Sequence, residues 1–317
     1  MTIVQNQNTI NAMKNILSFL FAFACCCTVN AQNYKLSLNL VKGKDYFQNT
    51  NAVMSIKQNV NGMDMNINMT ISCTVKHTVT AVVNDVYTMD VSYVNMAMKM
   101  DMPTGAMEFN SEKNDAGNPM GTVLSKMINK PFQVKINKVG KILEVSNTES
   151  LFSGAFEGVE LPEAQREQMK AQLKQSYGDK AFRGSMEMLT GVFPDKPVAK
   201  GGTWAINSKV ETTMVLALAA VYKLEEVTPT AYVLSSTATV NSENKDAFVA
   251  MNGFPMRFDM TGTYVSNVKL DKTSGWVIES KIVQDIKGKT FIKESEQLPQ
   301  GMTIPMEITG TSTIKGH

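Results

Sequence analysis

The sequence has few of the side chains on which most enzyme and metal sites depend. Its 317 residues include two histidines and four cysteines, so a histidine-based catalytic set or a cluster of His and Cys metal ligands has little material. It contains no HExxH, P-loop or G-x-G-x-x-G motif. Basic and acidic side chains number 31 and 29, and nucleic-acid binding needs a clustered surplus of Lys and Arg. We therefore expect no catalytic residues, no cofactor, no metal site and no nucleic-acid partner.

The N-terminal segment has the pattern of a secretory signal. A short basic start precedes the apolar run of residues 16–29, and small residues precede a cleavage point after Ala31. We predict that residues 1–31 are a signal peptide, with Met13 as an alternative translation start, and that the protein is periplasmic or extracellular. Anchoring as a lipoprotein through Cys25 is the less favoured alternative. After signal removal we expect no transmembrane segment, because no later run is long and apolar enough.

One cysteine and one internal histidine remain in the mature chain. Cys73 is alone after signal removal and cannot form an internal disulfide. It shares the apolar face of a predicted strand with His77, so we expect a small buried side chain and not a reactive thiol. We expect His77 to be a core histidine bonded to a backbone or hydroxyl group. His317 is the last residue, and we expect it to be disordered.

Alternation of apolar and polar residues dominates the rest of the chain. From Met63 to Val83 the odd positions are mostly apolar and the first eight even positions are polar, so alternate side chains face opposite sides of a strand. Twenty-one residues would reach nearly 70 Å at about 3.3 Å each, several times a usual strand length. Such a strand must bend or break, which predicts a strongly curved antiparallel sheet of long strands.

A turn signal and one change in the phase of alternation support the prediction of this sheet. Asn61-Gly62 is a dipeptide suited to a tight hairpin, because both positions tolerate positive φ. Near Val94-Asn95 the apolar positions change from odd to even numbers. A slip of one residue inside a strand indicates a β-bulge, which would bend the sheet there. Meander connectivity is the simplest arrangement of these strands.

The middle of the chain changes from strand to helix patterns. Spacings of three and four residues predict helices over Pro162–Tyr177 and Lys180–Leu189, and residues 121–130 could form a short helix. The run Val215–Val221 is apolar at every position and predicts a strand buried on both sides. The helices would supply its cover, with the core between sheet and helices.

These patterns divide the chain into four parts. They are the signal peptide 1–31, a first β-unit 32–147, a helical insert 148–194 and a second β-unit 195–317. The two β-units share the pattern K-G-x-x-aromatic-x-x-N-hydroxyl, which begins at Lys42 and again at Lys200. Both duplication and coincidence remain open, so the β-units form either one domain or two similar halves.

Several short motifs also occur in a known family. They are Lys42-Gly43 ahead of an aromatic residue, Asn118-Pro119, Lys130-Pro131-Phe132, Phe193–Val198, Gly202-Thr203-Trp204, Thr273–Trp276 and Met302–Met306. Because these motifs are spread over nearly all of the mature chain, the chain resembles a family of secreted bacterial proteins known only as a domain of unknown function. That resemblance implies no activity and no catalytic residues. More loosely, the expected architecture is similar to that of the half-barrel lipoprotein carriers of the bacterial envelope, although fold does not carry function.

Methionine is the residue type in excess, at 23 of 317 residues. Six methionines share faces of predicted strands and are our candidate ligand-binding residues: Met63, Met65, Met69, Met96, Met98 and Met100. Flexible thioether chains could fill a closed core, or they could form an adaptable wall for a hydrophobic ligand. They could also bind Cu(I), because soft ligands select soft metals.

Together these features predict a mainly β (α+β) fold. We expect one or more long, curved antiparallel sheets, half-barrel-like, with the helical insert packed on the sheet. The leading function is non-catalytic binding of a hydrophobic or lipid-like ligand, or of an envelope protein partner. A structural or interaction module with a closed core is the alternative, Cu(I) binding through methionine is third, and an enzyme is last.

Overall fold

A computed structural model describes residues 32–113, 118–211, 214–251, 253–296 and 298–317. The predicted signal peptide, residues 1–31, lies outside the described residues. The chain divides at Asn33, and its second unit, Tyr34–His317, is compact and contains the long sheet, the helices and the core.

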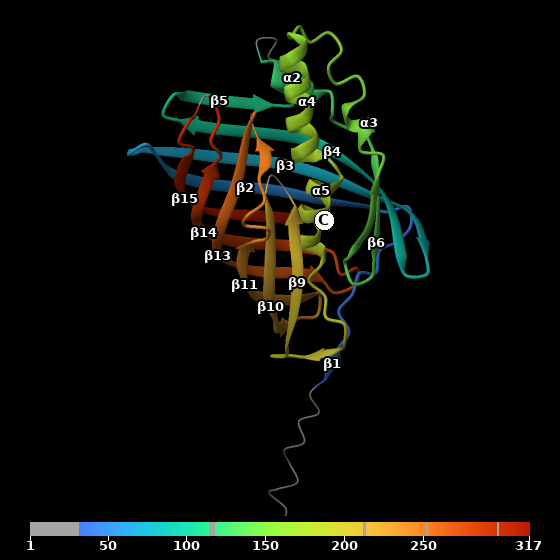
Figure 1. Ribbon diagram of the computed structural model, residues 1–317. Coiled ribbons are helices and arrows are strands. Elements are labelled where there is room, and N and C mark those ends of the chain that lie inside the picture. The colour runs from blue at the N-terminus through green and yellow to red at the C-terminus, as the bar shows by residue number, and fades with distance from the viewer. Residues whose placement is uncertain (1–31, 114–117, 212–213, 252, 297) are drawn as a thin grey trace, which may run out of the picture. The chain divides into compact units, whose positions relative to one another are not determined.

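Long antiparallel strands make up most of the second unit (Figure 1). After β1 (Asn33–Tyr34) the strands are β2 (Asp45–Val60), β3 (Met63–Val83), β4 (Val86–Met102), β5 (Gly105–Asn110), β6 (Phe132–Asn137), β7 (Ile142–Ser146), β8 (Val198–Ala199), β9 (Thr203–Glu211), β10 (Val215–Val227), β11 (Ala231–Ser242), β12 (Val249–Met251), β13 (Phe254–Asp271), β14 (Val277–Ile292) and β15 (Met302–Gly316). The helices are α2 (Pro119–Ser125), α3 (Glu149–Phe152), α4 (Glu163–Tyr177) and α5 (Asp179–Thr190).

One 13-stranded sheet contains the long strands, in the order β7-β6-β4-β3-β2-β15-β14-β13-β11-β10-β9. In addition, β5 pairs with β4 and β12 pairs with β13. Most neighbours follow one another along the chain, which agrees with the predicted meander. The β2–β15 pair joins the N-terminal and C-terminal strands into the same sheet. The sheet is not closed, and β7 and β9 are its two ends. The prediction of a mainly β fold with a large, curved antiparallel sheet is confirmed.

The long strand predicted from Met63 is present as a single element. β3 runs from Met63 to Val83, and the turn before it has positive φ at Asn61 (53°) and Gly62 (82°), as a tight hairpin requires. Along the β3–β4 pair, Thr74 is opposite Asn95 and the next residue is opposite Tyr93. Val94 is therefore the extra residue of a β-bulge, which confirms the predicted phase change.

Two glycines allow neighbouring strands to approach closely on the curved part of the sheet. A Cβ atom at Gly262 would lie 2.2 Å from the carbonyl oxygen of Asp285, and one at Gly288 would lie 2.0 Å from that of Asp259. Real Cβ atoms do not tolerate such distances, so any other residue would push the strands apart. Glycines of this kind are a known means of bending a sheet.

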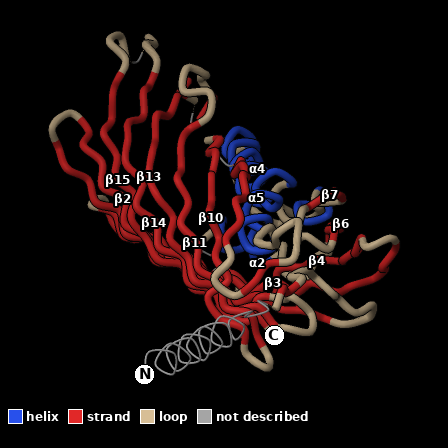
Figure 2. The backbone as a smooth tube through the Cα atoms, turned by 90° about the horizontal axis from the view of Figure 1, so that it is seen from below, coloured by secondary structure: helices blue, strands red, loops and turns tan. Residues whose placement is uncertain are grey.

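The helices pack on one face of the sheet, which we call the inner face. α5 contacts β7 and β9, while α2 contacts β4 and β5. The ring of Phe182 in α5 lies 4.7 Å from that of Phe132 in β6, and the ring of Tyr177 in α4 lies 5.8 Å from that of Tyr93 in β4. Figure 2 shows α4 and α5 inside the curve of the sheet. This agrees with the expected core between sheet and helices.

The predictions for α4 and α5 are correct to within one residue at each end, and α2 ends five residues earlier than expected. One strand prediction is wrong. We expected Val215–Val221 to be buried on both faces. Within this run of β10 only the inner-face residues Leu216, Leu218 and Ala220 are buried, and Val221 is 54% exposed. Alanine and valine occupy the outer positions of this run. They are apolar like the buried residues between them, so the period-two burial of the strand could not be recognised from the sequence. The described helices cover part of the inner face of the sheet, at β4, β5, β7 and β9, and pack on no strand from the outer face.

The two Lys-Gly motifs form the same backbone arrangement. The amide of Gly43 donates to the carbonyl of Val79 (2.7 Å), and the amide of Gly201 donates to that of Leu224 (2.7 Å). In return, the amide of Val79 donates to the carbonyl of Lys44 (3.1 Å), and the amide of Leu224 donates to the carbonyl of Gly202 (3.0 Å). The duplication itself remains a prediction, as do the boundaries of the β-units.

Candidate functional site: a methionine-lined inner face

Methionines from four neighbouring strands form one row across the inner face. Met54 of β2 is opposite Met69 of β3. Met69 is opposite Met100 of β4, and Met100 is opposite Met107 of β5. Opposite residues of antiparallel strands have Cβ atoms about 4.5–5.5 Å apart, so neighbouring side chains of this row lie within contact distance. We call Met54, Met69, Met100 and Met107 the methionine row.

The structure places five of the six predicted methionines together on the inner face. Met65, Met69, Met98 and Met100 are half-buried, and Met96 is 3% exposed and opposite Cys73. Met63 begins β3 beside the hairpin and is 66% exposed. Their role in ligand binding remains a prediction.

Sequence reasoning missed two members of the row, Met54 and Met107. Alternation showed that Met54 belongs to a strand, but only the register shows that it lies opposite Met69. Met107 is in β5, a short strand that did not stand out from the loop around it, and it is 53% exposed. Cross-strand register depends on turns and bulges, which a single sequence specifies poorly.

Isoleucines extend the apolar surface on both sides of the row. Ile56 is opposite both Ile67 and Ile308, and Ile71 is opposite Met98. All of these side chains are half-buried, not buried. In Figure 2 the outer ends of β2, β13 and β15 extend beyond the helices.

A polar strip on the inner face of β11, β13 and β14 lies on the β15 side of the methionine row. The hydroxyl groups of Ser236 and Ser266 are 2.8 Å apart, and both residues are buried. Tyr264 and Gln284 lie opposite each other in the next row, and both are half-buried. Burial raises the pKa of Tyr264, so its hydroxyl stays protonated and can donate a hydrogen bond at neutral pH.

His77 is a core histidine, as expected, although its partner is an amide side chain. Its Nε2 atom lies 3.2 Å from Oε1 of Gln48, and the ring of Trp276 packs edge-on at 5.1 Å. Among the described residues, His77 Nδ1 and Gln48 Nε2 have no hydrogen-bond partner. Burial lowers the pKa of His77 to about 3, so the ring is neutral at physiological pH.

Cys73 and His317 have distinct surroundings. Cys73 is a free thiol on the inner face, and burial raises its pKa to about 12. It is therefore protonated at neutral pH and a poor nucleophile, as expected. The prediction for His317 is wrong, since its ring stacks on that of Phe47 at 4.9 Å.

Helix α5 contacts both ends of the open sheet. Glu187 accepts a hydrogen bond from the Ile142 amide (3.0 Å), and Arg183 donates to the Ile142 carbonyl, so α5 binds backbone groups of β7. Toward β9, a Cβ atom at Gly184 would lie 3.3 Å from the Glu211 nitrogen. A glycine at this position thus lets α5 pack closely against β9.

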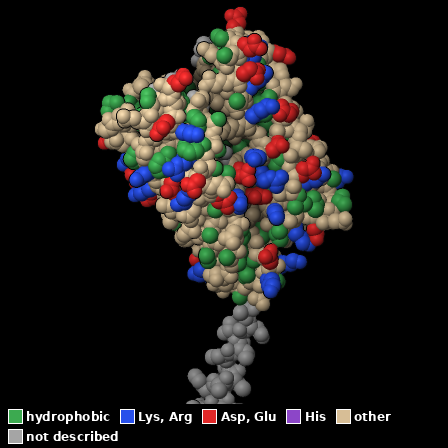
Figure 3. All heavy atoms as spheres, in the orientation of Figure 1, with side chains coloured by type: hydrophobic (Ala, Val, Ile, Leu, Met, Phe, Trp, Pro, Cys, Tyr) green, Lys and Arg blue, Asp and Glu red, His purple; other side chains and the backbone are tan. Residues whose placement is uncertain are grey.

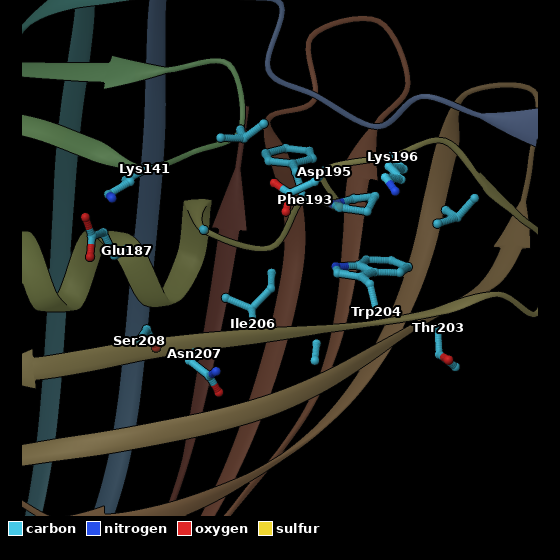
Figure 4. Close-up of a pocket in the computed structure, with 15 residues that line it drawn as sticks. Lys141, Glu187, Phe193, Asp195, Lys196, Thr203, Trp204, Ile206, Asn207 and Ser208 are labelled. Atoms are coloured by element: carbon cyan, nitrogen blue, oxygen red, sulfur yellow. The ribbon is translucent and has the colours of Figure 1, made fainter.

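A pocket of about 680 Å³ lies beside β9, lined by part of that strand and by the chain that follows α5 (Figure 4). Trp204 forms part of its wall, donates to the Val192 carbonyl (3.0 Å) and stacks on Tyr222 with the ring centroids 5.8 Å apart. Charges of both signs line the pocket. The sequence motifs Phe193–Val198 and Gly202-Thr203-Trp204 contribute much of the lining, but sequence reasoning did not predict a site there.

Within the described ranges, no group of three or more His, Cys, Asp or Glu side chains is placed to hold a metal ion. None of the described helices is long and apolar enough to cross a membrane. Figure 3 shows positive and negative side chains interspersed on the face of the molecule that it presents.

Fold and site define a class of protein: an open antiparallel β-sheet with a helical insert and an apolar inner face. The model of the DUF6263 family, described as a family of unknown function, matches residues 84–277, which is more than half of the chain. The chain belongs to this family, and the predicted resemblance to a family of unknown function is confirmed.

Comparison with solved structures gives remote matches. One is an outer membrane channel from Pseudomonas putida F1, with 6% identity, a TM-score of 0.27 and coverage of 88% of this chain and 97% of that chain. Another is the outer membrane protein OprG from Pseudomonas aeruginosa, with 7% identity, a TM-score of 0.25 and coverage of 87% and 97%. TM-scores this low do not define a common fold. A search of curated proteins finds no match.

Proposed function

We propose that this protein binds a hydrophobic or lipid-like ligand on its inner face and does no catalysis. One observation carries the proposal: the methionine row and the isoleucines beside it form an apolar surface that is only half-buried. Folding removes apolar side chains from water wherever it can, and soluble proteins rarely expose large contiguous apolar patches without a function. A ligand that covers this surface would complete its burial.

Methionine suits such a surface because its side chain is unbranched and flexible. Thioether chains can repack around ligands of different shape, which is why methionine is common at adaptable binding surfaces. The polar strip lies next to the apolar surface, with Tyr264 and Gln284 half-buried. These side chains could bond a polar end group, so an amphipathic ligand with an alkyl chain fits the face best.

The proposed location is outside the cytoplasm. The basic start, the apolar run of residues 16–29 and the small residues before Ala31 support export. We therefore place the binding activity in the cell envelope or outside the cell, where the partner would be a lipid or another apolar molecule.

A double variant at the centre of the methionine row tests the proposal. The purified protein is titrated with a fluorescent fatty acid, and lipids that co-purify with it are identified by mass spectrometry. In a Met69→Glu, Met100→Glu double variant, carboxylates replace two central thioethers, so probe binding should weaken by at least about tenfold. This equals about 1.4 kcal/mol, roughly the contribution of one partly buried apolar side chain.

Val53→Glu is the matched control. Val53 precedes Met54 in β2 but lies on the outer face and is 55% exposed. It should leave probe binding unchanged. If the wild type binds neither probe nor co-purified lipid, or if the control weakens binding as much as the double variant, the proposal is wrong. The first result would favour an interaction module with a closed core.

A further inference from the structure

We infer that the methionine row is also a binding site for a soft monovalent metal ion, Cu(I) or Ag(I). Met54, Met69 and Met100 lie opposite one another on three adjacent strands, and Met107 continues the row on a fourth. The site does not depend on the proposed binding of an apolar ligand, because it requires sulfur atoms and not merely an apolar surface.

The geometry of the row allows several thioethers to reach one ion. Adjacent Cβ atoms are about 4.5–5.5 Å apart, and the sulfur of each side chain is two bonds beyond its Cβ. The central residue, Met69, has a methionine on each side. Met98 is the next inner-face residue before Met100 in β4 and supplies a further sulfur nearby. Three sulfur atoms around one ion therefore need only side-chain rotation, without movement of the strands.

The exposure of the row permits an ion to enter. Met54, Met69 and Met100 are half-buried, and Met107 is 53% exposed. A row sealed in the core would have no entry path, and fully exposed side chains would lose more rotamer freedom when ordered. Here the ion could enter from the β5 side and lie between side chains that are already partly ordered by packing.

The chemistry of the row selects the metal. Thioether sulfur is neutral and soft, so it binds Cu(I) in preference to hard ions, which need oxygen ligands. A divalent ion at an apolar surface without carboxylates would lose hydration and gain no opposite charge, which is costly. Among the residues that the structure describes, no three or more His, Cys, Asp or Glu side chains lie together so that they could hold a metal ion. The row therefore favours a monovalent ion.

Cys73 is the competing soft ligand on the same face. It is opposite Met96 in β4, and Ile71 separates it from Met69 along the inner face of β3. Binding there would require loss of the thiol proton. Separate substitutions of Cys73 and of the methionine row therefore show which of the two sites binds the ion.

Metal-free protein is titrated anaerobically with Cu(I) in the presence of a chromophoric Cu(I) chelator. We expect the wild type to remove one Cu(I) per chain from the chelator. The test variant is Met69→Leu, Met100→Leu, which keeps the volume and apolar character of the row but removes two sulfur atoms. Loss of a residue that merely orients a metal ligand costs about 10–100-fold in affinity, so we expect loss of two ligands to weaken Cu(I) binding by at least about 100-fold.

Two control variants complete the test. Met188→Leu changes a half-buried methionine of α5, and Cys73→Ser removes the competing thiol; both should bind Cu(I) as the wild type does. X-ray absorption of the copper complex should show sulfur ligands. The inference is overturned if the double leucine variant binds Cu(I) like the wild type, or if Cys73→Ser abolishes binding. Fatty-acid binding should survive in the leucine variant, so failure of the metal site and failure of the proposed function give different results.

Discussion

Acid should destabilise this protein through one side chain, His77. The ring is buried and neutral, with its pKa lowered from 6.5 to about 3 by burial. In the unfolded chain the same ring takes up a proton below pH 6.5, whereas in the folded protein it does not. Its contribution to stability is therefore complete above pH 6.5 and is lost as the pH falls toward about 3.

The size of the effect follows from the shift. Each pH unit below the unfolded pKa costs about 1.4 kcal/mol, so the free energy of unfolding should fall by about 2 kcal/mol between pH 7 and pH 5. This window lies above the usual pKa values of Asp and Glu, so carboxyl groups contribute little to the change. Urea unfolding followed by tryptophan fluorescence at several pH values measures it.

A His77→Leu variant separates this histidine from every other titrating group. The variant loses the contact with Gln48 and should be less stable at pH 7, but its loss of stability between pH 7 and pH 5 should disappear. Equal losses in wild type and variant would refute the reasoning, and so would a wild type whose stability is constant over this range.

Three further predictions concern packing and reactivity. Phe132→Ala removes a fully buried ring that contacts Phe182 and should cost about 3–5 kcal/mol in urea unfolding; a loss below about 1 kcal/mol would contradict the packing. Gly288→Ala places a Cβ atom 2.0 Å from the Asp259 carbonyl oxygen and should lower stability by about 1–3 kcal/mol; a neutral effect would show that the strands can separate freely. Iodoacetamide should label Cys73, with a pKa of about 12, at least roughly 100-fold more slowly in the folded protein than in urea, and equal rates would contradict its burial.

Much of the fold follows from local patterns in the sequence. Alternation from Met63 to Val83 and the Asn61-Gly62 turn predicted β3 and its hairpin, because period-two burial and positive φ depend on nearby residues only. The bulge at Val94 was visible for the same reason, since it changes the phase of alternation. Strand β10 was misread because alanine and valine occupy its outer face, where polar residues would have marked the exposed side.

The site was predictable only in part, because it depends on long-range pairing. Composition and alternation identified methionine as the distinctive residue and assigned five inner-face positions correctly. Met54 and Met107 join the row through the β2–β3 and β4–β5 registers, which no local signal specifies. The β2–β15 pair likewise joins residues distant in sequence. The pocket beside β9 could not be predicted, because residues as distant in sequence as Lys141, Glu187 and Trp204 line it together.

The central claim is that the apolar inner face accepts a hydrophobic ligand, and methyl NMR of methionine tests it most directly. Protein labelled with ¹³C at the methionine methyl groups is titrated with a long-chain fatty acid. The signals of Met54, Met69, Met98 and Met100 should shift together with one binding constant, while those of the fully buried Met89 and Met127 stay in place. Saturation without any shift in the four inner-face signals would contradict the claim.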